Sequence, residues 1–139
     1  MTITQDNNFH KLSETDIYLV GHIYETAYLI DKIKEYSIIL GEFYANPSCA
    51  FIDKNNKWCL VGGSTLILWT LKKTLEIKDD NLYWAYEIRQ TDPNKVQILI
   101  DPWANNSSIW ELNISTGERK KISNFDTYKN KEFTEIIEW

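Results

Sequence analysis

The chain has 139 residues and a net charge of −5, and 43 % of its residues are hydrophobic and 14 % aromatic. This length fits a single domain, residues 1–139, that is large enough to bury a core without disulfides or metals. The negative charge argues against a nucleic-acid-binding protein, which needs positive charge to neutralise phosphates. It permits a basic protein partner.

The first residues, Met1–Asn8, are polar and contain neither the basic nor the apolar region of a signal peptide. No apolar run approaches the length of a membrane span. We therefore expect a cytoplasmic protein. In that reducing compartment, the thiols of Cys49 and Cys59 are expected to be free.

Runs of β-branched and aromatic residues between turn signals predict an all-β, antiparallel meander. Residues 25–36 fit a helix or a strand, and we favour a strand; residues 125–138 fit a short C-terminal helix or a strand equally well. The ten strands predicted outside these two segments are 17–23, 36–44, 49–53, 57–61, 65–71, 74–78, 82–90, 95–101, 108–114 and 118–123.

Two stretches, residues 49–78 and 82–123, repeat one pattern of strands and turns. In each, a polar hairpin turn joins two apolar strands, and a loop then leads to a strand that carries a tryptophan. Trp69 and Trp110 occupy matching places, 41 residues apart. A period of about 40 residues with four strands is typical of propeller blades. We expect two adjacent blade-like sheets, with both tryptophans facing inward.

The hairpin turn between residues 53 and 57 sets the register of its two strands. If Asn55 and Asn56 lie at its centre, Ile52 faces Cys59 and Cys49 faces Gly62. The two thiols are then not opposite each other, which is a second reason to expect no disulfide.

Connections in an antiparallel meander alternate between the two ends of the sheet, so the loop charges can be assigned to ends. One end is expected to be basic, and the other acidic and aromatic, with the C-terminal glutamates extending it. The basic end holds Lys54, Lys57, Lys72, Lys73, Lys95 and Arg119. The acidic end holds Asp79, Asp80, Asp101, Trp103, Glu132 and Glu135.

No catalytic motif is found in the sequence, so we expect a protein that is not an enzyme and that has no cofactor or metal. His10 and His22 lack the spacing of a zinc site with the two cysteines. The calcium-loop pattern that begins at Asp53 lacks the required glycine and glutamate. A pairing of His22 with a cysteine nucleophile has no flanking motif to support it.

Two binding functions remain. In the first, the acidic and aromatic surface covers the active site of a basic partner, with carboxylates steering association and aromatic side chains anchoring it. In the second, Trp103 is a stacking platform for a sugar or another small ligand, which also hydrogen-bonds to Asp101, Asn105 and Asn106.

A resemblance favours the first function. Residues 101–117 (DPWANNSSIWELNISTG) and 128–139 (YKNKEFTEIIEW) resemble the small immunity proteins of bacterial contact-dependent growth inhibition and related polymorphic toxin systems. The resemblance covers the C-terminal two-fifths of the chain. It implies a cytoplasmic protein that binds and neutralises one cognate toxin domain, often a nuclease. We expect the protein itself to be a monomer. These families share no catalytic motif, so the resemblance transfers no site residue by position.

Overall fold

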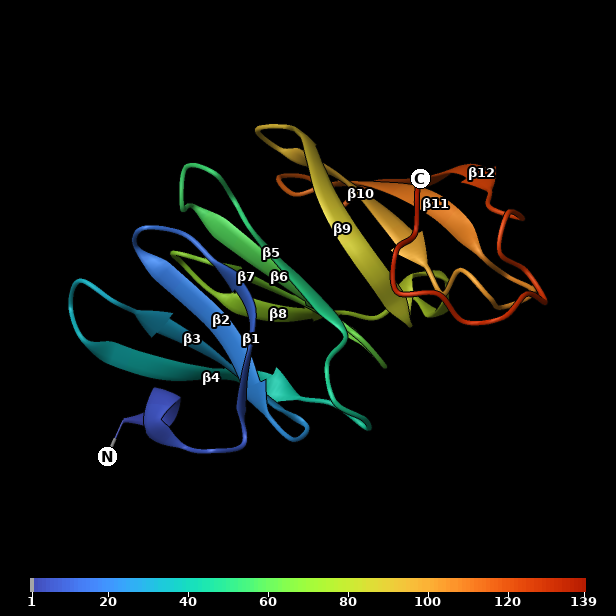
Figure 1. Cartoon of the computed structure of the whole chain (residues 1–139). Coiled ribbons are helices and arrows are strands. Elements are labelled where there is room, and N and C mark those ends of the chain that lie inside the picture. Colours follow the sequence, from blue (N-terminus) through green and yellow to red (C-terminus); the bar gives the residue numbers. More distant parts are fainter. Residues whose placement is uncertain (1) are drawn as a thin grey trace.

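The computed structural model describes residues 2–139, and it is an all-β protein built from three four-stranded antiparallel sheets (Figure 1). Each sheet is a meander in which consecutive strands are neighbours. The first sheet contains β1 (Phe9–Glu14), β2 (Tyr18–Ile23), β3 (Thr26–Asp31) and β4 (Tyr36–Glu42). The second sheet contains β5 (Cys49–Ile52), β6 (Trp58–Gly62), β7 (Leu66–Thr70) and β8 (Thr74–Ile77). The third sheet contains β9 (Ala85–Asp92), β10 (Lys95–Ile100), β11 (Ser108–Asn113) and β12 (Arg119–Asn124). Two short 3-10 turns, η1 (Ile3–Gln5) and η2 (Asp80–Leu82), complete the elements.

The ten strands expected outside the ambiguous segments are present, with small shifts at their ends. The strand favoured within residues 25–36 is confirmed as β3. The second and third sheets are the two expected blade-like units, and the first sheet adds a third unit of the same kind. Residues 125–139 form neither the short helix nor the strand considered for them.

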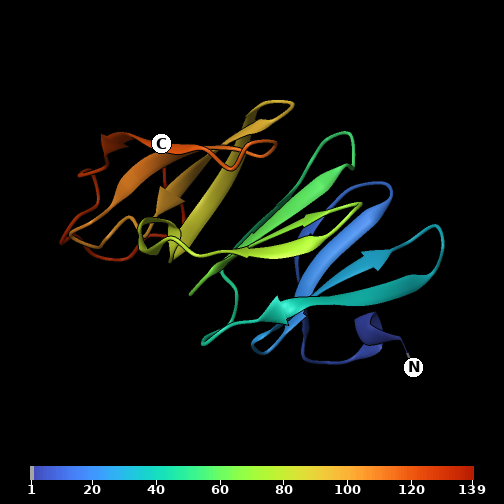
Figure 2. The same cartoon turned by 180° about the vertical axis from the view of Figure 1, so that it is seen from behind.

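The three sheets are arranged like adjacent blades of a fan (Figures 1 and 2). The first strands of the sheets are the innermost, since β1 contacts β5 and β5 contacts β9. The last strands, β4, β8 and β12, form the outer edges of their sheets. Within residues 2–139 there is no helix long and apolar enough to span a membrane.

The core consists of two apolar layers, one on each face of the second sheet. Trp69 belongs to the layer between the first and second sheets, together with Val20 and Leu29. Trp110 packs against the layer between the second and third sheets, which contains Leu60 and Ile98. Each tryptophan therefore faces the preceding sheet, and the two occupy the equivalent inward positions that the repeat predicted. They differ in burial: Trp69 is 7 % exposed, whereas Trp110 is only partly buried.

The register of the β5–β6 hairpin is the expected one, because Cys49 pairs with Gly62 and Ile52 pairs with Cys59. Both cysteines are free and buried. Burial raises the pKa of each thiol to about 12. Neither thiol is therefore ionised near neutral pH, which makes both poor nucleophiles.

We expect both thiols to be silent in the folded protein and reactive in the unfolded one. The thiolate is the reacting form, and burial removes it as well as access to it. Titration with a thiol reagent should find two reactive groups per chain in denaturant without reductant, and almost none in native buffer. A rapid native reaction at either cysteine would contradict the buried register.

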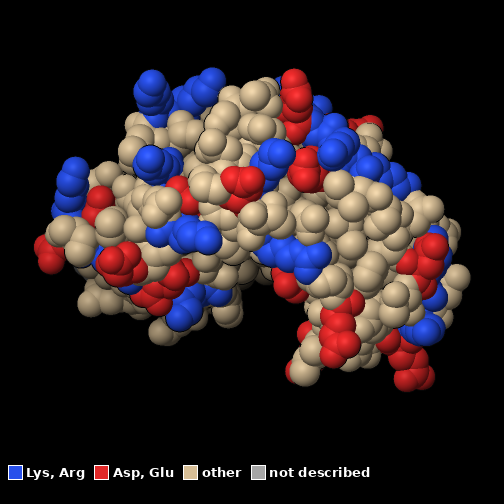
Figure 3. Space-filling view, turned by 90° about the horizontal axis from the view of Figure 1, so that it is seen from above, with Lys and Arg blue, Asp and Glu red and all other residues tan. Residues whose placement is uncertain are grey.

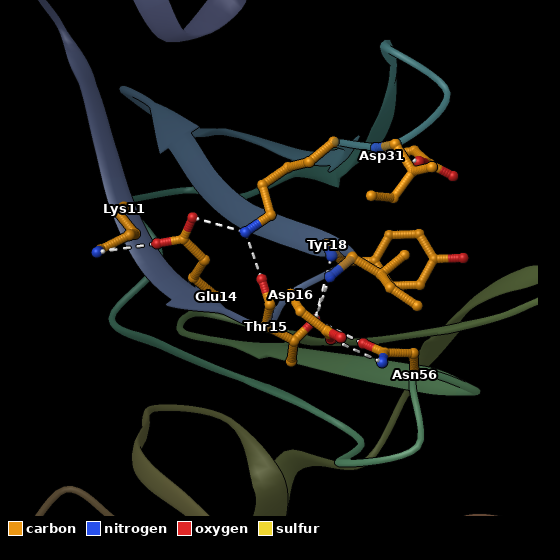
Figure 4. A network of polar contacts seen from close by, with 10 residues as sticks. Lys11, Glu14, Thr15, Asp16, Tyr18, Asp31 and Asn56 are labelled. Carbon is orange, nitrogen blue, oxygen red and sulfur yellow. Dashed lines mark hydrogen bonds and ion pairs between the residues drawn. The ribbon is translucent and has the colours of Figure 1, made fainter.

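A polar network ties the turns of the first sheet to the second (Figure 4). Glu14 accepts hydrogen bonds from the ammonium groups of Lys32 (2.9 Å) and Lys11 (3.2 Å), and the Thr15 hydroxyl donates to the Asn56 side chain (2.5 Å). Lys32 and then Lys11 lower the pKa of the Glu14 carboxyl. The stabilisation from the ion pairs of Glu14 is therefore fully present at pH values above the ordinary pKa of a glutamate. It is lost as the pH falls through the lowered pKa of Glu14.

Candidate functional site

The loops of this fold gather at two ends of the molecule, which differ in what they carry. We call one the linker end because it holds both linkers between sheets, residues 43–48 and 78–84, together with turns 24–25 and 63–65 and loop 101–107. It lies toward the lower side of Figure 1. The opposite hairpin end holds turns 15–17, 32–35, 53–57, 71–73, 93–94 and 114–118.

Hydrogen bonds join the loops of the linker end into one continuous scaffold across the three sheets. Each bond has a backbone N–H as donor, so the path depends on the course of the chain more than on side-chain rotamers. The bonds run from Phe43 N to Glu25 O (2.9 Å), from Tyr44 N to Ser64 Oγ (2.9 Å), from Trp84 N to Gly63 O, and from Asp101 N to Trp84 O (3.0 Å).

This scaffold displays three aromatic side chains in solvent. Tyr24 is 57 % exposed, Tyr44 97 % and Trp84 54 %. Tyr44 and Trp84 are themselves residues of the bonded scaffold, and Tyr24 is next to Glu25, which is another. Exposed aromatic side chains are typical of the anchors of protein interfaces, because their burial stabilises a complex at a low cost in conformational entropy.

The backbone of Trp84 adopts a left-handed conformation, with φ of +65°. A bulky residue other than glycine rarely adopts this conformation, and it costs energy unless surrounding contacts enforce it. Here its N–H donates to Gly63 and its carbonyl accepts from Asp101. The molecule therefore maintains a strained backbone at the residue that exposes an indole.

Carboxylates accompany these aromatic side chains. Glu25, Glu42 and Asp80 are exposed and take part in no ion pair within residues 2–139. Glu25 follows Tyr24 directly, and Glu42 lies two residues before Tyr44. The linker end thus combines apolar anchors with unneutralised negative charge.

The six residues expected to form the acidic surface have different roles in the structure. Asp80 is exposed at η2, as expected. Asp79 is instead partly buried: it accepts a hydrogen bond from Asn81 N (2.9 Å) and forms an ion pair with Arg119 (3.5 Å). Arg119 was expected at the opposite, basic end. Because it pairs with Asp79, positive and negative charges meet along the outer strands and are not confined to opposite ends.

Trp103 is not the open platform that its loop position suggested. It is half-buried, edge-on to Tyr86 with ring centroids 5.3 Å apart, and stacked with a tilt on Phe133 at 5.1 Å. Its indole Nε1 is buried and has no hydrogen-bond partner among residues 2–139. Asp101 caps this loop by accepting from Trp103 N (3.1 Å). Phe133 stacks on the Trp103 ring, so Trp103 is not the fully exposed platform expected for stacking a sugar.

Phe133 belongs to the C-terminal segment, residues 125–139, which runs over the third sheet (Figure 1). Arg89 holds its end: the guanidinium lies 3.9 Å from the centroid of the Trp139 ring and donates to the Trp139 carbonyl. Glu132 and Glu135 are exposed on this segment. Burial first, and then the charges of Glu87 and Glu135, raise the pKa of the Tyr86 phenol. The segment therefore carries its glutamates to the region of Tyr86 and Trp103.

The hairpin end has a mixed charge, as seen in Figure 3, where Lys and Arg are spread across the surface with Asp and Glu among them. Asp53 lies in the 53–57 turn of this end, but it is 2 % exposed and does not face solvent. Its carboxylate accepts from Gln90 Nε2 (2.9 Å) and from Lys57 N (3.1 Å). It closes the β5–β6 turn and joins it to β9.

The two histidines of the chain contact each other. His10 and His22 stack on neighbouring strands at 5.4 Å, and His22 Nδ1 is 2.8 Å from the Tyr24 carbonyl. No group of three or more His, Cys, Asp or Glu side chains in this range is placed to hold a metal ion.

No known family model matches the chain, and no curated protein matches it significantly.

Sequence reasoning did not single out Tyr24, Tyr44 or Trp84. Tyr44 and Trp84 were placed inside expected strands, 36–44 and 82–90, which begin or end short of them in the structure. A signal was available for Tyr44, because Ala-Asn-Pro follows it and such a sequence usually ends a strand. Trp84 had no comparable local signal.

Proposed function

We propose that this protein is an immunity protein that binds a cognate bacterial toxin domain through its linker end and thereby neutralises it. The observation that carries the proposal is the bonded loop scaffold that exposes Tyr24, Tyr44 and Trp84 beside unpaired carboxylates. The resemblance of residues 101–117 and 128–139 to immunity proteins supports the same function. The toxin domain is proposed to be basic, to be a nuclease, and to be met in the cytoplasm.

The physical logic of such an inhibitor is the mimicry of a polyanion. A nuclease surface that binds phosphates is positively charged, and it attracts a carboxylate-rich surface from a distance. Aromatic side chains then exclude water at the centre of the interface and slow dissociation. Glu25, Glu42 and Asp80 can supply the first effect, and Trp84 and Tyr44 the second.

The direct test is co-expression with the product of the neighbouring reading frame, followed by purification on a tag carried by only one partner. A stoichiometric complex that survives gel filtration supports the proposal. A monomeric protein with no partner, together with binding to immobilised glycans, would instead support the small-ligand alternative.

Charge reversal at the linker end should slow association with the toxin domain. The variant Glu42→Lys with Asp80→Lys removes exposed carboxylates that attract a basic partner. We expect about a tenfold lower association rate at low salt and a weaker dependence of that rate on ionic strength. Stopped-flow mixing at several salt concentrations measures both.

Asp79→Lys is a poorer probe, because Asp79 caps η2 and pairs with Arg119. The matched control is charge reversal on the hairpin end, Lys54→Glu with Lys34→Glu, which should leave the association rate nearly unchanged. If the control changes the association rate while the linker-end variant does not, the partner binds the hairpin end.

A further inference from the structure

The wedge between the second and third sheets opens into a cleft of about 670 Å³ at their outer strands. The corresponding opening between the first and second sheets is smaller, about 270 Å³. β4 packs closely on β7 here, since a Cβ at Gly41 would lie 2.4 Å from Ile67 Cδ1. The larger cleft has a volume in the range of ligand-binding sites.

The cleft is basic around an apolar floor. The floor is formed by Trp58, Leu68, Leu75, Ile77 and Ile114, all of which belong to or pack on the core between the two sheets. The cationic residues of its lining are Lys57, Lys72, Lys73, Lys78 and Arg119.

Little within the molecule neutralises this charge. None of the four lysines forms an ion pair with another residue in 2–139, and Arg119 has only the contact with Asp79 at 3.5 Å. Glu76 is the one carboxylate in the lining, and it accepts a hydrogen bond from Thr65 (2.8 Å), which lines the smaller opening on the opposite side of the second sheet. A protein of net charge −5 thus keeps a local excess of positive charge here.

We propose that this cleft binds an acidic peptide segment whose carboxylates alternate with apolar side chains. The lysines would meet the carboxylates at the rim, where charge mainly governs specificity and association rate, and the floor would accept the apolar side chains. The cleft shares only Lys78 with the linker end and takes a partner of opposite charge, so this proposal stands independently of the toxin complex.

The lining favours a peptide over single-stranded nucleic acid. Nucleic acid that binds in basic grooves is usually held by aromatic side chains on which the bases stack. The only aromatic residue in this lining is Trp58, which is 4 % exposed and donates its Nε1 to the Pro93 carbonyl (3.3 Å). The floor therefore offers aliphatic contacts and no stacking platform.

The probe is a fluorescein-labelled peptide with the sequence of residues 132–139, EFTEIIEW, which combines three glutamates with four apolar residues. Fluorescence anisotropy with the full chain should show saturable binding. Lys72→Glu with Lys73→Glu should weaken binding by about tenfold or more, whereas the control Lys34→Glu with Lys54→Glu should leave it unchanged. Circular dichroism melting confirms that both variants are folded.

Two altered peptides test the chemistry of the occupant. Replacing the three glutamates with glutamine should weaken binding by about tenfold, and replacing Phe133, Ile136 and Ile137 with serine should weaken it similarly. Equal binding of the serine peptide would show a non-specific anion site and overturn the proposal. Stronger binding of a labelled oligo(U) than of the peptide would overturn it in favour of nucleic acid.

The peptide could also displace the chain's own C-terminal segment from the third sheet. The variant Arg89→Ala removes the contacts that hold Trp139 there, and it leaves the cleft unchanged. Peptide binding that responds to Arg89→Ala and not to the lysine reversals would overturn the proposal, as would the absence of saturable binding.

Discussion

Replacing Trp69 with alanine is expected to lower the free energy of unfolding by about 3–5 kcal/mol, because the change leaves a cavity in a close-packed layer. Trp69 is 7 % exposed, and its ring lies edge-on to Tyr18 with centroids 5.3 Å apart, so it joins the second sheet to the first. Since small domains are stable by only about 5–15 kcal/mol, this loss is a large part of the total. Urea unfolding followed by far-UV circular dichroism measures it without depending on tryptophan fluorescence.

Trp110→Ala is the matched comparison at the corresponding position of the next unit. Part of its ring is exposed, and its Nε1 donates to the hydroxyl of Ser108 (2.9 Å). We expect a smaller loss, about 1–3 kcal/mol, since less apolar surface is removed from the core. Equal losses for the two variants would mean that their unequal burial does not control stability.

The sequence predicted those parts of the fold that depend on local chemistry. The β5–β6 register followed from the Asn55-Asn56 turn, and Asn56 has the positive φ of 60° that asparagine tolerates. Gly117 lies in the turn between β11 and β12, where a hairpin requires positive φ, and its φ is +76°. The repeat of about 40 residues identified the second and third sheets because each unit has the same order of strands and turns.

The first strand was missed because it is a polar edge strand. In Phe9–Glu14 only Phe9 and Leu12 are apolar, and three of the six residues are exposed. Such a segment has little periodicity, and pairing with β2 stabilises it. His10 lies in this strand opposite His22.

The candidate site was harder to predict because tertiary contacts create it. The conformation of Trp84 depends on Gly63 and Asp101, which are 21 and 17 residues away in sequence. Trp103 was expected to be exposed, but Phe133 from the C-terminal segment stacks on it. That segment forms no regular element, and Phe133 and Ile136 are 71 % and 77 % exposed, so it has no buried face whose period the sequence could show.

Truncation of Trp84 is expected to weaken the proposed toxin complex by about 2–4 kcal/mol, mainly through faster dissociation. Trp84 is 54 % exposed on the bonded scaffold of the linker end, where a partner can bury the whole indole. Tyr44→Ala should have an effect of similar size, because its side chain is 97 % exposed. Surface plasmon resonance with the immobilised toxin domain gives both rate constants.

Two forms of the Trp84 truncation separate loss of the anchor from damage to the loop. Trp84→Ala keeps the left-handed backbone under strain, whereas Trp84→Gly relieves it, since glycine adopts positive φ freely. If the indole is the anchor, both variants lose affinity equally, although Trp84→Gly should be the more stable protein. Tyr36→Ala is the control, because Tyr36 is 46 % exposed but lies beside the hairpin end. A complex weakened by Tyr36→Ala and untouched by both Trp84 variants would place the toxin on another surface.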